Sequence, residues 1–325
     1  MKQSILSTIG STPLVQLRNA IPTSHFKLFG KCEFLNPGGS NKDRSALNII
    51  RRARESGAID HNTTVIESSS GNFGIGLAYV CKFFGLRFIC VVDSRTNLRT
   101  IQIIKSFDAE IELITEPDPV NGKLLYARIN RVQELLKKIP NSFNPNQYSN
   151  LHNAEAHYFT MEEIARDLSG DVDYLFVATS TCGTLRGCAD YIRSHNLPTK
   201  IVAVDALGSV IFSSNPVECK RLIPGHGAGR RPELFRDDLA DQCIHVTDWE
   251  CVVGCHRLLN KEAIFAGGSS GGVLSAISRL QEEILPGTNC VMILCDLGER
   301  YLDTIYSDTW VKENFGKRLQ EITTD

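Results

Sequence analysis

Short apolar runs that alternate with amphipathic stretches constrain the fold of this chain most strongly. Apolar runs typical of buried strands recur at residues 63–68, 87–93, 109–115, 173–179, 200–206 and 290–295. Between them lie stretches such as 46–54 and 124–137, in which apolar residues return every three or four positions, as in a helix. Strands that alternate with helices predict an α/β protein with mostly parallel sheets.

The length of 325 residues suffices for two packed lobes with a cleft between them. A proline- and asparagine-rich segment at 139–150 interrupts the alternation and is the best candidate for a boundary. A second irregular segment, 223–235, is rich in glycine and arginine, which is typical of a loop over a site or of plain mobile surface. We therefore expect one catalytic unit made of two lobes.

Composition excludes several classes of protein. A hydrophobic content of 42% and a net charge of -2 give no electrostatic reason to expect binding to nucleic acid. No apolar stretch has the length of a membrane span, and the first residues lack the apolar core of a secretory signal, so we expect a cytoplasmic protein. The eleven cysteines include no CxxC pair, which favours reduced thiols over disulfides or a metal site.

The segment NPGGSNKDR at 36–44 is the strongest single indication of chemistry. A proline and two glycines predict a sharp turn, which would place Lys42 at the start of a helix. A lysine that condenses with an aldehyde must be partly desolvated and able to lose its proton, and a buried helix start favours this because the positive end of the helix dipole disfavours an ammonium. A lone lysine in a turn is usually solvated surface, so the neighbouring motifs must decide.

Three further segments rich in small residues come at the start of a helix, and the first two follow an apolar run. The first, ESSSGNFGIGLA at 67–78, offers hydroxyls and backbone N–H groups that suit a carboxylate. Its glycines do not follow GxGxxG, which disfavours a dinucleotide site. The second, STCGTLRG at 180–187, suits a phosphate dianion, and the third, FAGGSSGGVL at 265–274, places Ser269 at a helix start. Each one alone could be a plain turn or helix start.

Taken together and in this order, the four segments resemble those of the pyridoxal 5'-phosphate (PLP) dependent cysteine synthases and cystathionine β-synthases. The segments 224–232 and 298–302 resemble further parts of that family, so that the likeness runs from residue 11 to residue 302. The resemblance implies fold type II, with two lobes of mostly parallel sheets and the cofactor in the cleft. It also implies a homodimer, a larger cofactor-binding lobe of residues 1–44 and 146–325, and a smaller mobile lobe of residues 45–145.

The resemblance assigns roles to individual residues. It implies that Lys42 carries PLP and acts as the base, that Asn72 contacts the 3'-oxygen of the cofactor and that Ser269 binds its pyridine nitrogen. A loop with free N–H groups and hydroxyls would hold the cofactor phosphate: Ser180, Thr181, Cys182, Gly183 and Thr184. The carboxylate of an amino-acid substrate would be held by Ser69, Ser70, Gly71 and Phe73. No metal is implied.

Departures from cysteine synthases gather where an acceptor substrate would bind. The family threonine after the loop asparagine is Phe73, the phosphate loop begins with Ser180 and has Cys182 in place of a glycine, and the family QFxNPAN becomes QYSNLHN. In that last segment Tyr148 replaces phenylalanine and Leu151 replaces proline. These changes argue against sulfide or a thiol as the incoming nucleophile.

The chain resembles a branch of the family that makes N-(2-amino-2-carboxyethyl)-L-glutamate for 2,3-diaminopropionate, a building block of siderophores and peptide natural products. The likeness lies at residues 31–44, 127–135, 146–148, 204–212 and 298–310. That branch joins O-phospho-L-serine to L-glutamate and releases phosphate. Arg128, Tyr148 and Ser180 would then contact substrate, although an arginine on a helix is often only solvated surface.

Three other interpretations remain. A cysteine synthase would use O-acetylserine or O-phosphoserine with sulfide, in the same cleft. A catalytically silent homologue would bind another protein's terminus there, although Lys42, Asn72 and Ser269 would then serve no purpose. A nicotinamide oxidoreductase would need the glycine fingerprint that the chain lacks.

Overall fold

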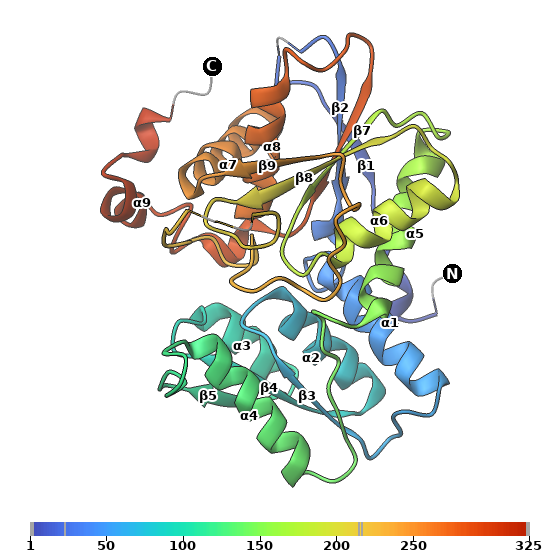
Figure 1. Cartoon of the computed structure of the whole chain (residues 1–325), viewed down its shortest axis with the longest axis vertical. Coiled ribbons are helices and arrows are strands. Elements are labelled where there is room, and N and C mark those ends of the chain that lie inside the picture. Colours follow the sequence, from blue (N-terminus) through green and yellow to red (C-terminus); the bar gives the residue numbers. More distant parts are fainter. Residues whose placement is uncertain (1–2, 23, 214, 216, 323–325) are drawn as a thin grey trace.

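The computed structural model describes residues 3–22, 24–213, 215 and 217–322. Among these residues the strands form two sheets, one in each lobe of the molecule (Figure 1). The larger sheet has six strands, in the order β1 (Leu14–Leu17), β2 (Lys27–Cys32), β10 (Asn289–Leu294), β7 (Tyr174–Ala178), β8 (Lys200–Ala206) and β9 (Gln242–Val246). Only the pairing of β1 with β2 is antiparallel in this sheet. The predicted α/β fold with mostly parallel sheets is confirmed.

Helices cover both faces of the larger sheet (Figure 1). On one face lie α5 (Leu151–Asp167) and α6 (Gly183–Ser194), and on the other lie α7 (Asp248–Glu262) and α8 (Gly268–Leu280). The described residues also form helix α9 (Asp308–Phe315) and four short 3-10 helices: η1 (Ile5–Thr8), η2 (Glu33–Leu35), η3 (Gly298–Tyr301) and η4 (Leu319–Glu321). Every residue of β10 is buried, as expected for a central strand with helices on both sides.

The smaller sheet has four parallel strands, in the order β5 (Glu110–Ile114), β4 (Arg87–Asp93), β3 (Thr64–Ser68) and β6 (Ser142–Phe143). Its helices are α2 (Asn72–Phe84), α3 (Leu98–Ser106) and α4 (Leu124–Lys138). The six apolar runs of the sequence coincide with β3, β4, β5, β7, β8 and β10, so these strands were predictable.

Helix α1 (Lys42–Glu55) lies between the two lobes (Figure 1). Its buried residues Ala46, Ile49 and Ile50 belong to the apolar core that also holds β3 and α2. The opposite side of α1 packs against α5 of the larger lobe. The division at residues 44 and 145 therefore stays a prediction, because α1 contributes to the core of the smaller lobe and also packs against α5 of the larger one.

A buried set of four charges fixes the position of α1. The Glu163 carboxylate on α5 accepts hydrogen bonds from Lys31 and Arg44, with 2.7 Å between nitrogen and oxygen in each pair. Arg44 also donates to Glu33, with Nε 2.7 Å from Oε2. Two cations thus face two anions, and these hydrogen bonds lower the pKa of Glu163 to about 2 against the opposing effect of burial. The network joins β2, α1 and α5.

All eleven cysteines are free, and most are buried in the two lobes. Within the described ranges, no helix combines the length and the apolarity that crossing a membrane requires.

We predict that Glu163→Gln destabilises the protein strongly. The variant leaves Lys31 and Arg44 buried beside one carboxylate, and removal of one partner of a buried ion pair costs about 3–5 kcal/mol. The matched control is Glu155→Gln on the same helix, which breaks a partly exposed pair with Arg52 and should cost less than about 1 kcal/mol. Urea unfolding of both variants measures the difference, and equal losses would contradict a special role for the buried network.

The same carboxylate predicts a dependence on pH. Because its pKa is depressed from 4.5 to about 2 in the folded protein, Glu163 stabilises the fold above pH 4.5. That contribution is lost as the pH falls from 4.5 toward 2. Urea midpoints of the wild type and of Glu163→Gln should therefore converge over this range, and a constant gap would contradict the assignment.

Candidate active site

Lys42 is the first residue of α1, as the sequence predicts. The preceding Asn41 ties this helix start to two other elements: its backbone N–H donates to the Cys295 carbonyl at the end of β10 (2.9 Å), and its Nδ2 donates to Thr184 Oγ1 in α6 (3.1 Å). Lys42 Nζ in turn donates to Asn41 Oδ1 at 2.9 Å. The lysine amine therefore lies between the end of a central strand and the start of another helix.

Burial lowers the pKa of Lys42, and it is the largest influence on this group. The nearby Cys295, Asp296 and Glu33 act in the opposite direction. The sequence argument named desolvation together with the helix dipole, and in the structure loss of solvent is the main cause of the lowered pKa. A lysine amine with a lowered pKa is suited to condense with an aldehyde and to accept a proton.

The loop before α6 has the form of an anion cradle. Cys182 adopts a left-handed conformation (φ 63°) at the N-cap, which turns the chain into the helix. A Cβ on Gly183 would lie 2.4 Å from Asn153 Oδ1, so the close approach of the backbone requires glycine there. Asn153 also donates to Thr181 Oγ1 at 3.3 Å. The helix start thus presents N–H groups beside the threonine hydroxyls, as a phosphate needs.

The side chains of this loop differ in their surroundings. Cys182 is almost fully buried and its thiol pKa is raised to about 12 by burial, so it acts as a packing residue and not as a nucleophile. Thr181 and Thr184 are buried. Ser180 is half-buried, and no hydrogen bond of its hydroxyl occurs within the described part of the chain.

Ser269 lies in the first turn of α8, as predicted. The adjacent Ser270 Oγ accepts from the backbone N–H of Cys295 at 3.1 Å, and the carbonyl of Cys295 accepts from Asn41. Burial raises the pKa of the Cys295 thiol to about 11, and the nearby Ser269 hydroxyl acts in the opposite direction. The start of α8 therefore meets the start of α1 across the end of β10.

Asn72, the first residue of α2, connects the smaller lobe to the larger one. Its Nδ2 donates to Asp296 Oδ2 at 2.7 Å, and its Oδ1 accepts from Arg300 Nη1 at 2.6 Å. Tyr301 donates to the same Asp296 oxygen at 2.6 Å. Sequence reasoning missed Asp296 and Arg300, although the GERYL segment that contains Arg300 was recognised as a family segment.

In the serine-rich turn before α2, some residues are packed in the interior and others remain accessible. Ser69 is buried and its Oγ accepts from the Gly74 N–H at 2.9 Å, which stabilises the helix start. The Phe73 side chain is 2% exposed in the core of the smaller lobe, so only its backbone could contact a substrate. Ser70 is half-buried, and a Cβ on Gly71 would meet open space. Their role in binding a carboxylate stays a prediction.

The two remaining predicted contacts lie in different settings. Arg128 is buried on α4, with its Nε 3.2 Å from Asp93 Oδ2 at the end of β4. Its charge is therefore already paired within the smaller lobe. Tyr148 is half-buried, and the guanidinium carbon of Arg230 lies 5.5 Å from the centre of its ring. Contact of either residue with substrate stays a prediction.

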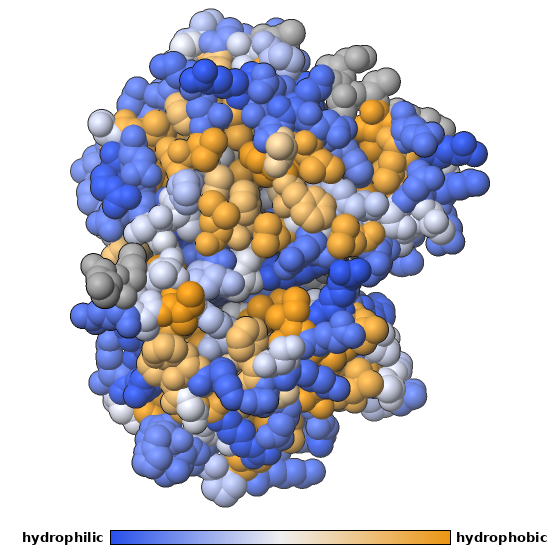
Figure 2. All heavy atoms as spheres, turned by 180° about the vertical axis from the view of Figure 1, so that it is seen from behind, coloured by the Kyte–Doolittle hydropathy of each residue, from blue (hydrophilic) through white to orange (hydrophobic). Residues whose placement is uncertain are grey.

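Four helix starts therefore converge, those of α1, α2, α6 and α8, at the carboxyl ends of the parallel strands. The hydrogen bonds of Asn41, Asn72 and Cys295 hold these starts together. The surface is hollowed between the two lobes (Figure 2). A lysine amine of lowered pKa, a glycine cradle for a dianion and a neutral serine at a helix start fit the aldehyde, phosphate and ring nitrogen of PLP.

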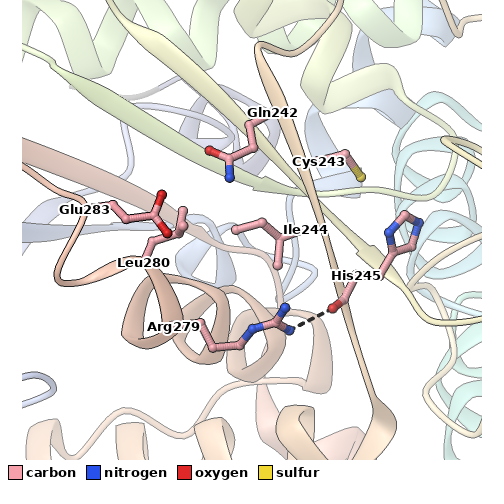
Figure 3. A pocket seen from close by; sticks show the side chains of 7 residues that line it. All are labelled: Gln242, Cys243, Ile244, His245, Arg279, Leu280 and Glu283. Atoms are coloured by element: carbon pink, nitrogen blue, oxygen red, sulfur yellow. Dashed lines mark hydrogen bonds between the residues drawn. The ribbon is translucent and has the colours of Figure 1, made fainter.

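A second hollow lies elsewhere, at the free edge of the larger sheet (Figure 3). Its volume is about 460 Å³, and its lining comes from β9 and the end of α8: Gln242, Cys243, Ile244, His245, Arg279, Leu280 and Glu283. Arg279 donates to the His245 carbonyl at 2.8 Å. Since Ser269 and Arg279 occupy opposite ends of α8, this hollow is roughly 15 Å from the convergent helix starts.

Comparison with known proteins agrees with this geometry. The family model described as pyridoxal-phosphate dependent enzyme matches residues 5–296. The structure of a hydrogen sulfide-producing enzyme from Fusobacterium nucleatum is 33% identical, with a TM-score of 0.86 over 93% of this chain and 100% of that chain. O-acetylserine sulfhydrylase isoform 3 from Entamoeba histolytica is 32% identical, with a TM-score of 0.87 over 94% of this chain and 92% of that chain.

A third similar structure is an O-ureido-L-serine synthase. It is 28% identical, with a TM-score of 0.87 over 97% of this chain and 96% of that chain. The matched family model spans the lysine turn, the serine-rich turn, the phosphate loop and Ser269. The chain thus belongs to the pyridoxal-phosphate dependent enzymes of the cysteine synthase and cystathionine β-synthase type, and its cofactor is PLP.

Proposed function

We propose that this PLP-dependent β-replacement enzyme joins O-phospho-L-serine to L-glutamate, giving N-(2-amino-2-carboxyethyl)-L-glutamate and phosphate. The product would supply 2,3-diaminopropionate for a siderophore or a peptide natural product. The observation that carries the proposal is a pair of half-buried hydroxyls, those of Tyr148 and Ser180, where cysteine synthases have phenylalanine and glycine. Within the described residues neither hydroxyl has an internal hydrogen bond, so both are available to a polar acceptor.

The residues of the chain divide the work of the reaction. Lys42 removes the α-proton of phosphoserine and later returns a proton to the product, as its lowered pKa permits. The start of α6 holds the cofactor phosphate, and the turn at Ser70 and Gly71 holds the substrate carboxylate. Bound PLP supplies an electron sink at the α-carbon, which allows the β-substituent to leave. Ser269 offers the ring nitrogen a neutral hydroxyl instead of a carboxylate.

We also infer that the two lobes move relative to each other during the reaction. Residues 45–145 would move as a lobe against residues 1–44 and 146–325 and close the cleft, which would exclude water from the half-reacted substrate. Asn72 supports this view, because its side chain already bridges the two lobes. We expect the enzyme to act as a homodimer in the cytoplasm.

Sulfide is the alternative acceptor. The relatives named as a hydrogen sulfide-producing enzyme and as O-acetylserine sulfhydrylase favour it, at 33% and 32% identity. The O-ureido-L-serine synthase is named for a product without sulfur, so that the same fold also serves other chemistry. Mass spectrometry of products from phosphoserine, with glutamate, sulfide and other amines in competition, separates the two. Cysteine as the main product would overturn the glutamate proposal.

We predict that Lys42→Ala abolishes turnover, because it removes both the attachment of the cofactor and the base. Product formation from phosphoserine and glutamate, followed by mass spectrometry, measures the loss. Loss of the visible absorbance of lysine-bound PLP should accompany it. Wild-type turnover without an added amine would contradict the assignment.

We predict that Ser269→Asp lowers the rate of β-replacement. A carboxylate at the ring nitrogen would favour its protonated form and change the electron sink. The cofactor spectrum and the rate with phosphoserine measure the effect. An unchanged spectrum together with an unchanged rate would count against Ser269 as the partner of the nitrogen.

We predict that Tyr148→Phe and Ser180→Gly weaken the reaction with glutamate while the reaction with phosphoserine largely survives. Loss of one hydrogen bond to a charged group costs about 1.5–3 kcal/mol, or roughly ten- to a hundredfold. Stopped-flow absorbance follows the two half-reactions separately, first the reaction with phosphoserine and then the reaction that starts when glutamate is added. Tyr158→Phe is the matched control, because that hydroxyl bonds to Ser194 on the far side of α6. Should both variants react with glutamate at the wild-type rate, these hydroxyls do not form the acceptor pocket.

A further inference from the structure

The loop at 223–235 is anchored beside the site at two points. Gly227 N–H donates to the Thr179 carbonyl at 2.7 Å, directly before the phosphate loop, and Leu234 N–H donates to the Tyr148 carbonyl at 3.2 Å. The connection from β8 to β9, which contains this loop, runs along the side of the larger lobe that faces the smaller one (Figure 1). Residues between the two anchors are therefore held near the mouth of the cleft.

Arg230 lies between these anchors and is half-buried. Its guanidinium carbon is 5.5 Å from the centre of the Tyr148 ring, within the range of a cation–π contact. Nowhere in the described ranges does Arg230 form an ion pair with an acidic side chain. By contrast, Arg128 is paired with Asp93, and Arg186 on α6 lies 3.8 Å from Asp190. Arg230 is therefore a cation that has been partly removed from water without an anion.

A guanidinium in this state favours an anion with two oxygens, because its N–H groups form a fork that matches a carboxylate or a phosphate. The guanidinium lies over the ring of Tyr148, a residue that also carries a hydroxyl. An acceptor such as sulfide has no group that would use this fork. The side-chain carboxylate of glutamate does, and so would the phosphate of the donor.

We propose that Arg230, together with Tyr148, binds the side-chain carboxylate of the acceptor amino acid and so selects glutamate. This inference rests on the proposed function and names the residue that recognises the side chain of the acceptor amino acid. We assign the acceptor and not the donor, because Arg230 contacts the ring that replaces the phenylalanine of cysteine synthases. Arg128, which the sequence suggested for this role, has its charge paired with Asp93.

The test compares Arg230→Met with Arg231→Met. Arg231 is the adjacent, exposed arginine, and its guanidinium lies over Phe235 instead of Tyr148. Each enzyme is first mixed with O-phosphoserine, and the absorbance change that follows glutamate or glutamine is then recorded over a range of concentrations. Glutamine has the same shape as glutamate but no side-chain charge. Arg230→Lys is a third variant, which keeps the charge and loses the fork.

For Arg230→Met we expect the half-saturating concentration of glutamate to rise roughly ten- to a hundredfold, as for loss of a charged hydrogen bond. The preference for glutamate over glutamine should fall by the same factor. Arg230→Lys should fall between the wild type and Arg230→Met, and Arg231→Met should match the wild type. The thermal midpoint and the PLP absorbance of each variant show whether it is folded and loaded.

Three outcomes would overturn the inference. A wild-type response of Arg230→Met to glutamate means that the residue does not contact the acceptor. Slower reaction with phosphoserine and unchanged reaction with glutamate means that Arg230 binds the donor phosphate. If wild-type enzyme loaded with phosphoserine reacts with sulfide and not with glutamate, the proposed function itself fails, and the wild-type data alone reveal this.

Discussion

Four buried charges fix helix α1, at whose start Lys42 lies. Glu163 and Glu33 hold Arg44 from two sides, two residues along α1 from Lys42, and Lys31 completes the set from the neighbouring strand. A charge removed from water is tolerated only when its partners are correctly placed, so this arrangement permits little rotation or sliding of α1. The position of the lysine amine is thereby set by residues that never meet a substrate.

Much of the fold was predictable because buried parallel strands leave continuous apolar runs in the sequence. Strand β9 was missed because the apolar residues of QCIHV alternate with half-exposed ones at the edge of the sheet. The helix-start residues Lys42 and Ser269 were found through motifs with fixed local geometry. Asp296 and Arg300 were missed as site residues, because their role depends on Asn72, which lies far away in the sequence.

Side-chain pairing over long distances also explains why the sequence does not distinguish the arginines near the cleft. In the sequence, Arg128 and Arg230 are two arginines beside family motifs. In the structure their surroundings differ, because Arg128 forms an ion pair with Asp93, whereas Arg230 lies over the aromatic ring of Tyr148. Whether an arginine has an anionic partner is a property of the folded chain, so the sequence cannot distinguish Arg128 from Arg230 in this respect.

Strand β10 lies in the middle of the larger sheet, between β2 and β7, although it is the last strand to be synthesised. Strand β2, which begins at Lys27, therefore cannot pair with β10 until the chain has been synthesised past Asn289. The smaller sheet, in contrast, pairs segments that lie within residues 64–143 and can form while the ribosome is still adding the rest. Because Cys295 and Asp296 follow β10 directly, Lys42 is synthesised long before the residues that surround it in the folded protein.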